Sequence, residues 1–214
     1  MVAGVVINIL FFVCFMQADI VLTARHGMNI WETIVQGKFS HFYEYNLNAG
    51  VTGRVSAVCF AMYEYAVYFL FAIWNLPLWL IEHFAKVDVL NSIIGLLWVK
   101  AILVPFCLIA FKEFIEISEL LGAKKESIYE AKTLLLVSPI LVQSVIVMSE
   151  YDIIAIAIIL IAIKYYLKDD MKKSILFFSL AMPFKYFAAF FLIPLLLYKE
   201  KRIIYIILDL INNY

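Results

Sequence analysis

The chain has 214 residues, of which 65% are hydrophobic and 16% are charged, and its formal net charge is zero. A soluble domain usually has about 45–50% apolar and about 25% charged residues. A soluble core of this length could not bury so much apolar side chain, so the composition predicts a membrane protein. The basic residues are spread thinly between apolar runs, which excludes a basic surface for nucleic acid.

Apolar runs of membrane-spanning length recur along the chain and are separated by charged residues. About 20 helical residues cross the roughly 30 Å hydrocarbon layer. These runs predict an all-α fold, a polytopic bundle of transmembrane helices that forms a single membrane domain over 1–214. The last run stops soon after it begins, so we expect an amino-terminal part of a longer protein. The runs are 2–22, 55–81, 89–111, 133–149, 153–167, a broken run at 174–198, and a final stretch from Ile203.

Lysine and arginine residues in short loops mark the cytoplasmic side of a membrane protein. The loops 112–132, 164–173 and 199–202 contain several such residues and are expected to be cytoplasmic. The short turns at 149–152 and 183–185 then lie on the external face. The sequence therefore predicts a multi-pass protein of the cell membrane.

The run 55–81 has two interpretations. If it spans the membrane, the polar segment 23–54 is cytoplasmic. If it lies along the interface or re-enters, that segment is external and the amino terminus is cytoplasmic. Its many tyrosine and tryptophan residues favour the second interpretation, with an external loop over 23–88 that contains surface helices. Within this loop, 26–38 is expected to form a short helix that stops at Gly37.

Acidic residues at the ends of apolar runs are candidate site residues, because a charge at membrane depth usually faces a cavity or a partner. Asp19 is expected at the far end of the first apolar helix, either as a functional group or as an interfacial carboxylate paired with Arg25. Glu150 and Asp152 lie in an external turn, where they could bind a cation, orient a hydroxyl or cap the next helix. Asp19 and Asp152 are expected at the same membrane face.

Two lysines and an aromatic cluster are further candidates. Lys185 splits the run 174–198 into stretches too short to span, and it could bind a phosphate or extend to the lipid headgroups. Lys100 lies in the middle of an apolar run, so we expect an acidic partner within the bundle. Tyr43 belongs to the cluster 39–45, which is typical of an interfacial belt and would equally suit sugar stacking. No nucleotide-binding or common hydrolase motif occurs.

Four segments of the chain are similar to a known family. They are Gln17-Ala18-Asp19, the loop with "GKFSHFYEYN" and "YFLFAIWNLPLWL", the segment "SPILVQSVIVMSEYDIIAIAIILIAI", and "SLAMPFKYFAAFFLIPLLL". In these segments and their order the chain resembles the GT-C superfamily of polytopic glycosyltransferases, in particular its bacterial and archaeal mannosyltransferase-like branches.

The resemblance implies an enzyme that moves a mannose-like hexose from a polyprenyl-phosphate donor in the membrane lipids to a glycan or lipid-linked acceptor of the cell envelope. Asp19 would be the general base, and Asp152 could hold Mg²⁺ or Mn²⁺. The alternatives are a transporter or flippase of lipid-linked sugars, which usually has an internal repeat that this chain lacks, and an inactive accessory fragment. The residues expected to bind substrate are Arg25, Tyr43, Glu150, Asp152 and Lys185.

Overall fold

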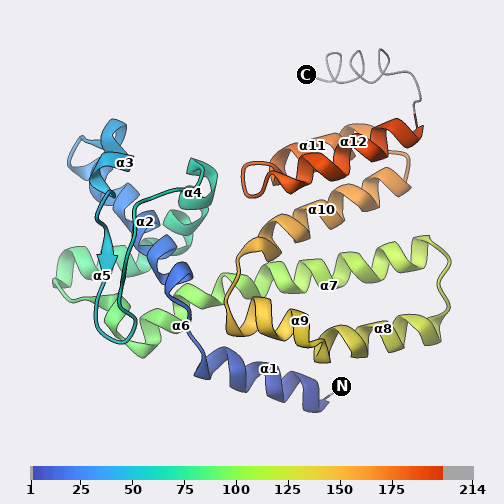
Figure 1. Ribbon diagram of the computed structural model, residues 1–214, viewed down its shortest axis with the longest axis horizontal. Helices are drawn as coiled ribbons and strands as arrows, with labels where there is room; N and C mark the ends of the chain where they lie inside the picture. Colours follow the sequence, from blue (N-terminus) through green and yellow to red (C-terminus); the bar gives the residue numbers. More distant parts are fainter. Residues whose placement is uncertain (1, 200–214) are drawn as a thin grey trace. The chain divides into compact units, whose positions relative to one another are not determined.

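The computed structural model describes residues 2–199, and nearly all of their regular structure is helical (Figure 1). A two-stranded antiparallel pair, β1 (Gly50–Val51) with β2 (Ala57–Val58), is the exception among these residues. The expectation of a helical protein is confirmed to that extent, and the predicted stretch from Ile203 lies outside the described residues. The α-helices are α1 (Val2–Cys14), α2 (Ala18–Val35), α3 (Phe42–Tyr45), α4 (Tyr65–Trp74), α5 (Leu76–Ala85), α6 (Ile93–Ala101), α7 (Leu103–Leu120), α8 (Lys125–Val137), α9 (Pro139–Leu141), α10 (Asp152–Leu167), α11 (Met171–Ala181) and α12 (Phe187–Lys199). The 3₁₀-helices are η1 (Phe39–His41) and η2 (Val89–Asn91), and η3 (Val142–Val147) is a π-helix.

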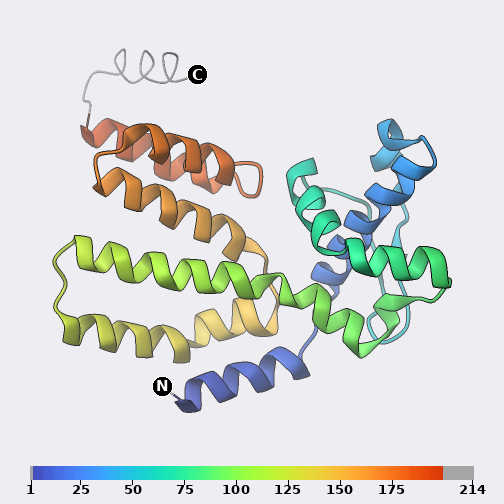
Figure 2. The same ribbon diagram turned by 180° about the vertical axis from the view of Figure 1, so that it is seen from behind.

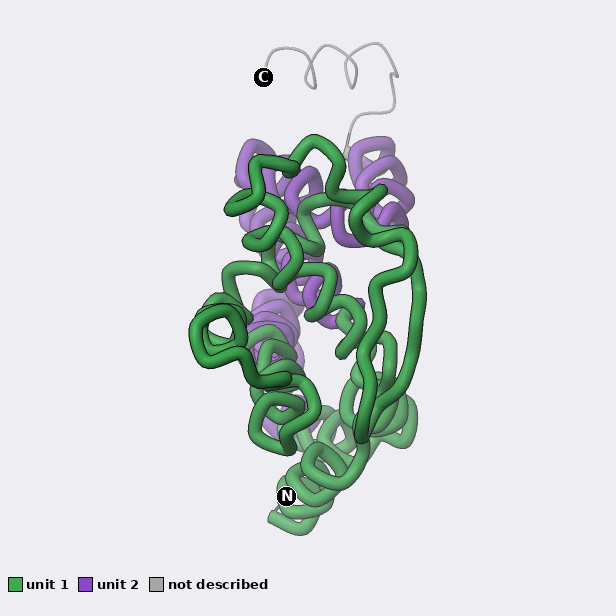
Figure 3. Tube along the Cα trace, turned by 90° about the vertical axis from the view of Figure 1, so that its left-hand side faces the viewer, with its two compact units in different colours: residues 1–106, 129–151 green, residues 107–128, 152–214 purple. Residues whose placement is uncertain are grey.

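The chain divides into two compact units, coloured green and purple in Figure 3. The first unit consists of residues 1–106 and 129–151, and the second of residues 107–128 and 152–214. The boundary between them falls between Tyr151 and Asp152, which are consecutive residues of the chain. The candidate site residues are therefore divided between the two units.

Two helices of the described chain are long and apolar enough to cross a membrane. One is Ile93–Leu120, which combines α6 and α7, and the other is Lys125–Val147, which combines α8, α9 and η3. Two bent pairs, α1 with α2 at 63° and α4 with α5 at 66°, would raise the number to four if each is one broken span. The runs predicted at 153–167 and 174–198 form helices of 16, 11 and 13 residues. Length and composition thus agree with association with a membrane.

The run 55–81 is not one continuous helix. Its first ten residues contain β2 and irregular chain, and the helices α4 and α5 that follow are separated at Asn75. Pro77 lies in the first turn of α5, where proline is tolerated because that N–H would lack a helical partner. Proline at this position favours the start of a new helix, which accounts for the bend between α4 and α5.

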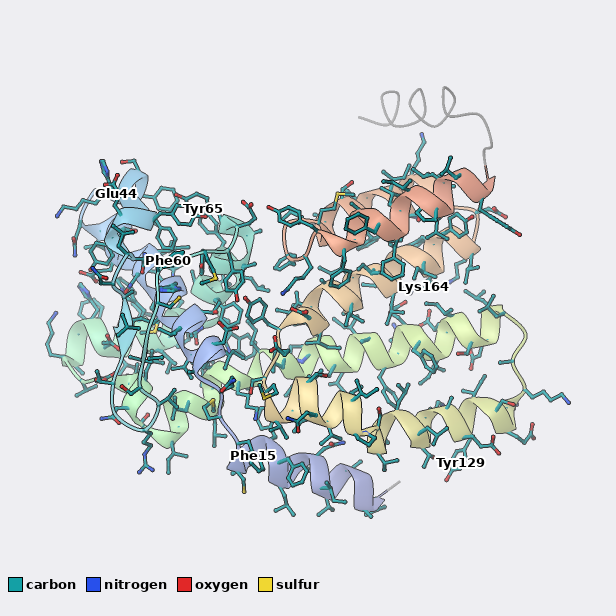
Figure 4. All side chains as sticks on the ribbon, viewed as in Figure 1. Phe15, Glu44, Phe60, Tyr65, Tyr129 and Lys164 are labelled. Carbon is teal, nitrogen blue, oxygen red and sulfur yellow. The ribbon has the colours of Figure 1, made fainter. Side chains whose placement is uncertain are left out.

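A second break separates α1 from α2 at residues 15–17. The ammonium group of Lys100 donates hydrogen bonds to the backbone carbonyls of Phe12 at 3.0 Å and Phe15 at 2.7 Å. Figure 4 labels Phe15 just beyond the end of α1. Carbonyls at a helix end lack helical partners and favour a cation. The prediction of an acidic partner for Lys100 was wrong. Among the described residues, its ammonium group bonds to these backbone oxygens instead.

The first unit is built around α2, which packs closely against α4. Gly27 makes this approach possible, because a Cβ atom there would lie 2.8 Å from the backbone nitrogen of Ala72. The surface helix expected over 26–38 begins eight residues earlier, at Ala18. Its predicted stop is confirmed: Gly37 has a φ of +68°, and the amide of Lys38 donates to the carbonyl of Thr33 at 2.8 Å.

The second unit contains three neighbouring helices, α10, α11 and α12, which lie side by side in Figures 1 and 2. Their shared core is formed by buried side chains that include Ala162, Phe178 and Leu192. Lys164, labelled in Figure 4, pairs with the buried carboxylate of Glu113. A buried charge needs such a partner, so this ion pair ties α10 to α7 within the second unit.

Candidate functional site

Asp19 lies in the first turn of α2, and its side chain is exposed. The prediction that it would end the first apolar helix was wrong, because α1 already stops at Cys14. Gln17 takes the N-cap position of α2 with an extended backbone, and its side chain accepts a hydrogen bond from the amide of Ala18 at 3.2 Å. A carboxylate in the first turn of a helix is stabilised by the helix dipole. Asp19 therefore lies where an apolar helix gives way to a more polar one.

Tyr63 is the residue that extends to Asp19. Its hydroxyl lies 3.5 Å from each carboxylate oxygen, which is the long end of a hydrogen bond. The backbone of Tyr63 is fixed from two sides. Its carbonyl accepts from the hydroxyl of Tyr43 at 2.8 Å, and its amide donates to the hydroxyl of Tyr68 at 3.0 Å. Tyr43, expected to bind substrate, thus holds the residue that contacts Asp19.

Tyr151 continues this aromatic cluster inside the first unit. Its ring packs edge-on against Tyr63, with 5.4 Å between centroids, and against Phe71 at 5.7 Å. The side chain is 2% exposed. Burial raises the pKa of Tyr151 far above its usual value, and its neighbours Tyr63 and Asp19 act in the same direction. The phenol therefore stays protonated and can only donate or accept a hydrogen bond.

The turn before Tyr151 has an unusual backbone. Ser149 is buried and has a φ of +56°, a conformation that residues other than glycine rarely adopt. The preceding segment is the π-helix η3, and the amide of Glu150 donates to the carbonyl of Ser144 at 3.0 Å. π-helical turns and strained residues are frequent at functional sites. This backbone fixes the position of Glu150, whose predicted contact with substrate stays a prediction.

Arg25 does not pair with Asp19. Its guanidinium binds Glu82 and lies 3.3 Å from a carboxylate oxygen of Asp88, and its side chain is only 16% exposed. The interpretation of Asp19 as an interfacial partner of Arg25 was therefore wrong. These partners lie 57 and 63 residues further along the chain, beyond the reach of a local sequence pattern. The phosphate contact predicted for Arg25 stays a prediction.

Asp152 and Lys185 form an ion pair within the second unit. The ammonium nitrogen of Lys185 lies 2.7 Å from a carboxylate oxygen of Asp152, and both side chains are partly exposed. Asp152 is the first residue of α10, where the helix dipole favours a carboxylate. The predicted break at Lys185 is confirmed, since α11 ends at Ala181 and α12 begins at Phe187.

The metal site predicted at Asp152 lacks a suitable set of ligands. Among residues 2–199, no group of three or more His, Cys, Asp and Glu side chains is arranged to hold an ion. The ammonium of Lys185 also occupies the position beside the Asp152 carboxylate that a cation would take. We therefore derive no step through a metal ion.

Comparison with known proteins does not assign the chain to a family. No family model, no curated protein and no solved structure matches this chain.

The candidate site in the first unit is thus one exposed carboxylate, Asp19, with a row of tyrosines behind it. Sequence reasoning found Asp19 and Tyr43 but missed Tyr63 and Tyr151. Tyr63 belongs to the dense group of rings over 62–79 that indicated an interfacial helix, and this composition gave no sign that one ring would extend to Asp19. The site offers a proton acceptor at the bend between an apolar helix and an amphipathic one.

Proposed function

We propose that this chain acts as a membrane glycosyltransferase that moves a mannose-like hexose from a polyprenyl-phosphate donor to an acceptor hydroxyl at the external membrane face. The observation that supports it best is the position of Asp19. Its exposed carboxylate follows a helix whose residues Val5, Ile9 and Val13 expose apolar side chains. A lipid-bound donor and a hydrophilic acceptor would meet at such a boundary between apolar and polar surroundings.

In the proposed reaction, a carboxylate oxygen of Asp19 removes the proton from the acceptor hydroxyl. The acceptor oxygen forms a bond to the anomeric carbon while the bond from that carbon to the phosphate oxygen breaks. The electron pair leaves with the polyprenyl phosphate, and the configuration at the anomeric carbon inverts. Tyr63 positions the carboxylate through its hydroxyl at 3.5 Å from both oxygens.

Phosphate is a good leaving group and needs a cation more than it needs a proton. Of Lys185 and Arg25, the two cations that the resemblance implies for this role, Lys185 is proposed to compensate its charge, because Arg25 lies among three carboxylates. Asp152 is proposed to orient the acceptor. A fixed cation that contacts developing negative charge contributes roughly 2.7–4 kcal/mol by analogy with oxyanion donors. In the structure both cations already have carboxylate partners, so binding of the phosphate would exchange one anion for another.

The proposed topology places several spans in the cell membrane with the amino terminus in the cytoplasm. Its first test is thiol labelling of Asp19→Cys and Asp152→Cys, each in a chain without Cys14, Cys59 and Cys107. We expect a membrane-impermeant thiol reagent to label both positions on intact cells. Labelling of one position only after lysis would put the two acids on different faces and contradict the proposed topology.

The transfer reaction itself is tested with a radiolabelled polyprenyl-phosphate hexose and membrane vesicles that contain the full protein. We expect label in a glycan or lipid acceptor. A transporter or flippase is the second candidate, because the bent pairs α1–α2 and α4–α5 resemble the broken helices of transporters. Label that crosses the vesicle membrane without a change of chemical linkage would favour transport and overturn the transferase proposal.

A further inference from the structure

A cavity of about 450 Å³ lies in the first unit, away from Asp19. It is bordered by α2, by Tyr45 at the end of α3, by α5 and by the turn that follows α5. Its volume falls within the range of small-molecule sites, about 300–1,000 Å³. The residues that matter for its chemistry are Arg25, Asn29, Glu32, Trp79, Glu82 and His83.

One wall of the cavity is a fixed aromatic surface. The ring of Trp79 stacks on His83 with 4.9 Å between centroids and an interplanar angle of 30°. The indole Nε1 of Trp79 donates to Glu32 at 3.4 Å, and Nδ1 of His83 lies 3.4 Å from the same carboxylate oxygen. A single carboxylate thus orients both rings. An indole fixed at the edge of a polar cavity can pack against the apolar face of a ligand.

The lining also contains an ion pair that is incompletely hydrogen-bonded. Arg25 binds Glu82 and Asp88 through its terminal nitrogens, while its buried Nε has no hydrogen-bond partner among the described residues. The second carboxylate oxygen, Oε2, of Glu82 is likewise buried and lacks a partner there. Buried polar atoms normally have partners. Both atoms are enclosed by protein, but the side chains of Arg25 and Glu82 are 16% and 28% exposed, and a hydroxyl group can donate to a carboxylate or accept from a guanidinium there.

The charges of the cavity argue against ions as its ligands. The carboxylates of Glu82 and Asp88 already share the guanidinium of Arg25, and Glu32 is bonded to Trp79 and His83. No cluster suited to a metal ion occurs within residues 2–199. An anion would meet three carboxylates, those of Glu32, Glu82 and Asp88, against the two cations Arg25 and Lys86, so the lining does not favour an anion. A neutral ligand rich in hydroxyl groups fits these surroundings best.

We propose that this cavity binds a distal sugar of the saccharide acceptor, with the sugar face on Trp79 and its hydroxyls on the exposed parts of Glu82 and Arg25. This assignment as an acceptor site rests on the proposed function. The cavity itself predicts a neutral saccharide as the ligand. Asn29 and Glu32, on the adjacent turns of α2, would determine which hydroxyl pattern is accepted.

The test is saccharide binding to the full protein in lipid nanodiscs, measured by saturation-transfer NMR and calorimetry with neutral manno-, gluco- and galacto-oligosaccharides. Trp79→Phe and Glu82→Gln are expected to weaken binding of the best oligosaccharide by about tenfold or more, because each removes a contact to the ligand. The matched controls are Trp98→Phe, in a stacked pair with Trp74, and Glu44→Gln, an exposed residue paired with His41. Neither control residue borders the cavity.

The outcomes separate this proposal from the transferase proposal. Unaltered binding by both cavity variants at wild-type thermal stability, or no binding of any oligosaccharide to the wild type, would overturn the acceptor site. A raised acceptor KM with unchanged kcat in the cavity variants would support it. Tight, variant-sensitive binding in a protein that transfers no sugar would retain the saccharide site and refute the transferase proposal.

Discussion

The Asp19→Asn variant is expected to transfer sugar about 10²- to 10⁴-fold more slowly than the wild type, with little change in the acceptor KM. A general base contributes a factor of this size because it takes a proton only in the transition state. Asparagine keeps the size of the side chain but cannot accept the proton. An interaction made only in the transition state lowers kcat and kcat/KM together, so initial rates over a range of acceptor concentrations measure the effect.

The control for this variant is Glu44→Gln, the same chemical change at an exposed residue of α3 whose partner is His41. It is expected to keep full activity. Tyr63→Phe is expected to lose less than tenfold, because its hydroxyl lies at 3.5 Å from the Asp19 oxygens and such a long hydrogen bond is weak. An Asp19→Asn protein that transfers sugar at the normal rate would show that another group is the base.

Those features of the fold that depend on local sequence could be predicted. Gly37 ends α2 because glycine readily adopts a positive φ. The break before α12 was predicted from Lys185, a charged residue that follows Pro183 within an apolar run. The break after Cys14 had no such signal. Phe15 and Met16 are apolar and continue the run, so nothing in the local pattern distinguishes the end of α1 from its middle.

Features that depend on long-range pairing could not be predicted. Arg25 finds its carboxylates more than 50 residues away, and Lys100 bonds to backbone oxygens, which every residue has. A sequence therefore shows that Lys100 needs partners, without showing which atoms supply them. The same holds for the cavity, since Glu32 and Trp79 are separated by 47 residues. Asp19 was found because a carboxylate at the end of an apolar run stands out by itself.

Lys100→Met is expected to destabilise the first unit by roughly 2–4 kcal/mol. The side chain of Lys100 is fully buried, and its ammonium bonds to the carbonyls of Phe12 and Phe15 at the end of α1. Methionine matches the apolar stem of lysine but has no donor, and each carbonyl left without a partner costs about 1–3 kcal/mol. Thermal unfolding in detergent, followed by near-ultraviolet circular dichroism, measures the loss.

Lys112→Met is the matched control, because it makes the same change on the same long helix at an exposed residue paired with Glu116 at 3.5 Å. Its effect should stay within about 0.5 kcal/mol. Equal stability of the two variants would show that the carbonyl contacts of Lys100 contribute nothing.

The Lys100→Met variant should also lower sugar transfer per folded molecule. Lys100 binds the carbonyl of Phe12, in the last turn of α1, and that of Phe15, just after α1. These carbonyls precede Gln17, which caps α2, and Asp19, which lies in its first turn. If this contact fixes the 63° bend, its loss changes the direction in which α2 presents the Asp19 carboxylate. A displacement of about 1 Å can cost roughly 100-fold in rate. Full activity in the folded fraction would show that the bend is maintained without Lys100, by the packing of α2 against α4.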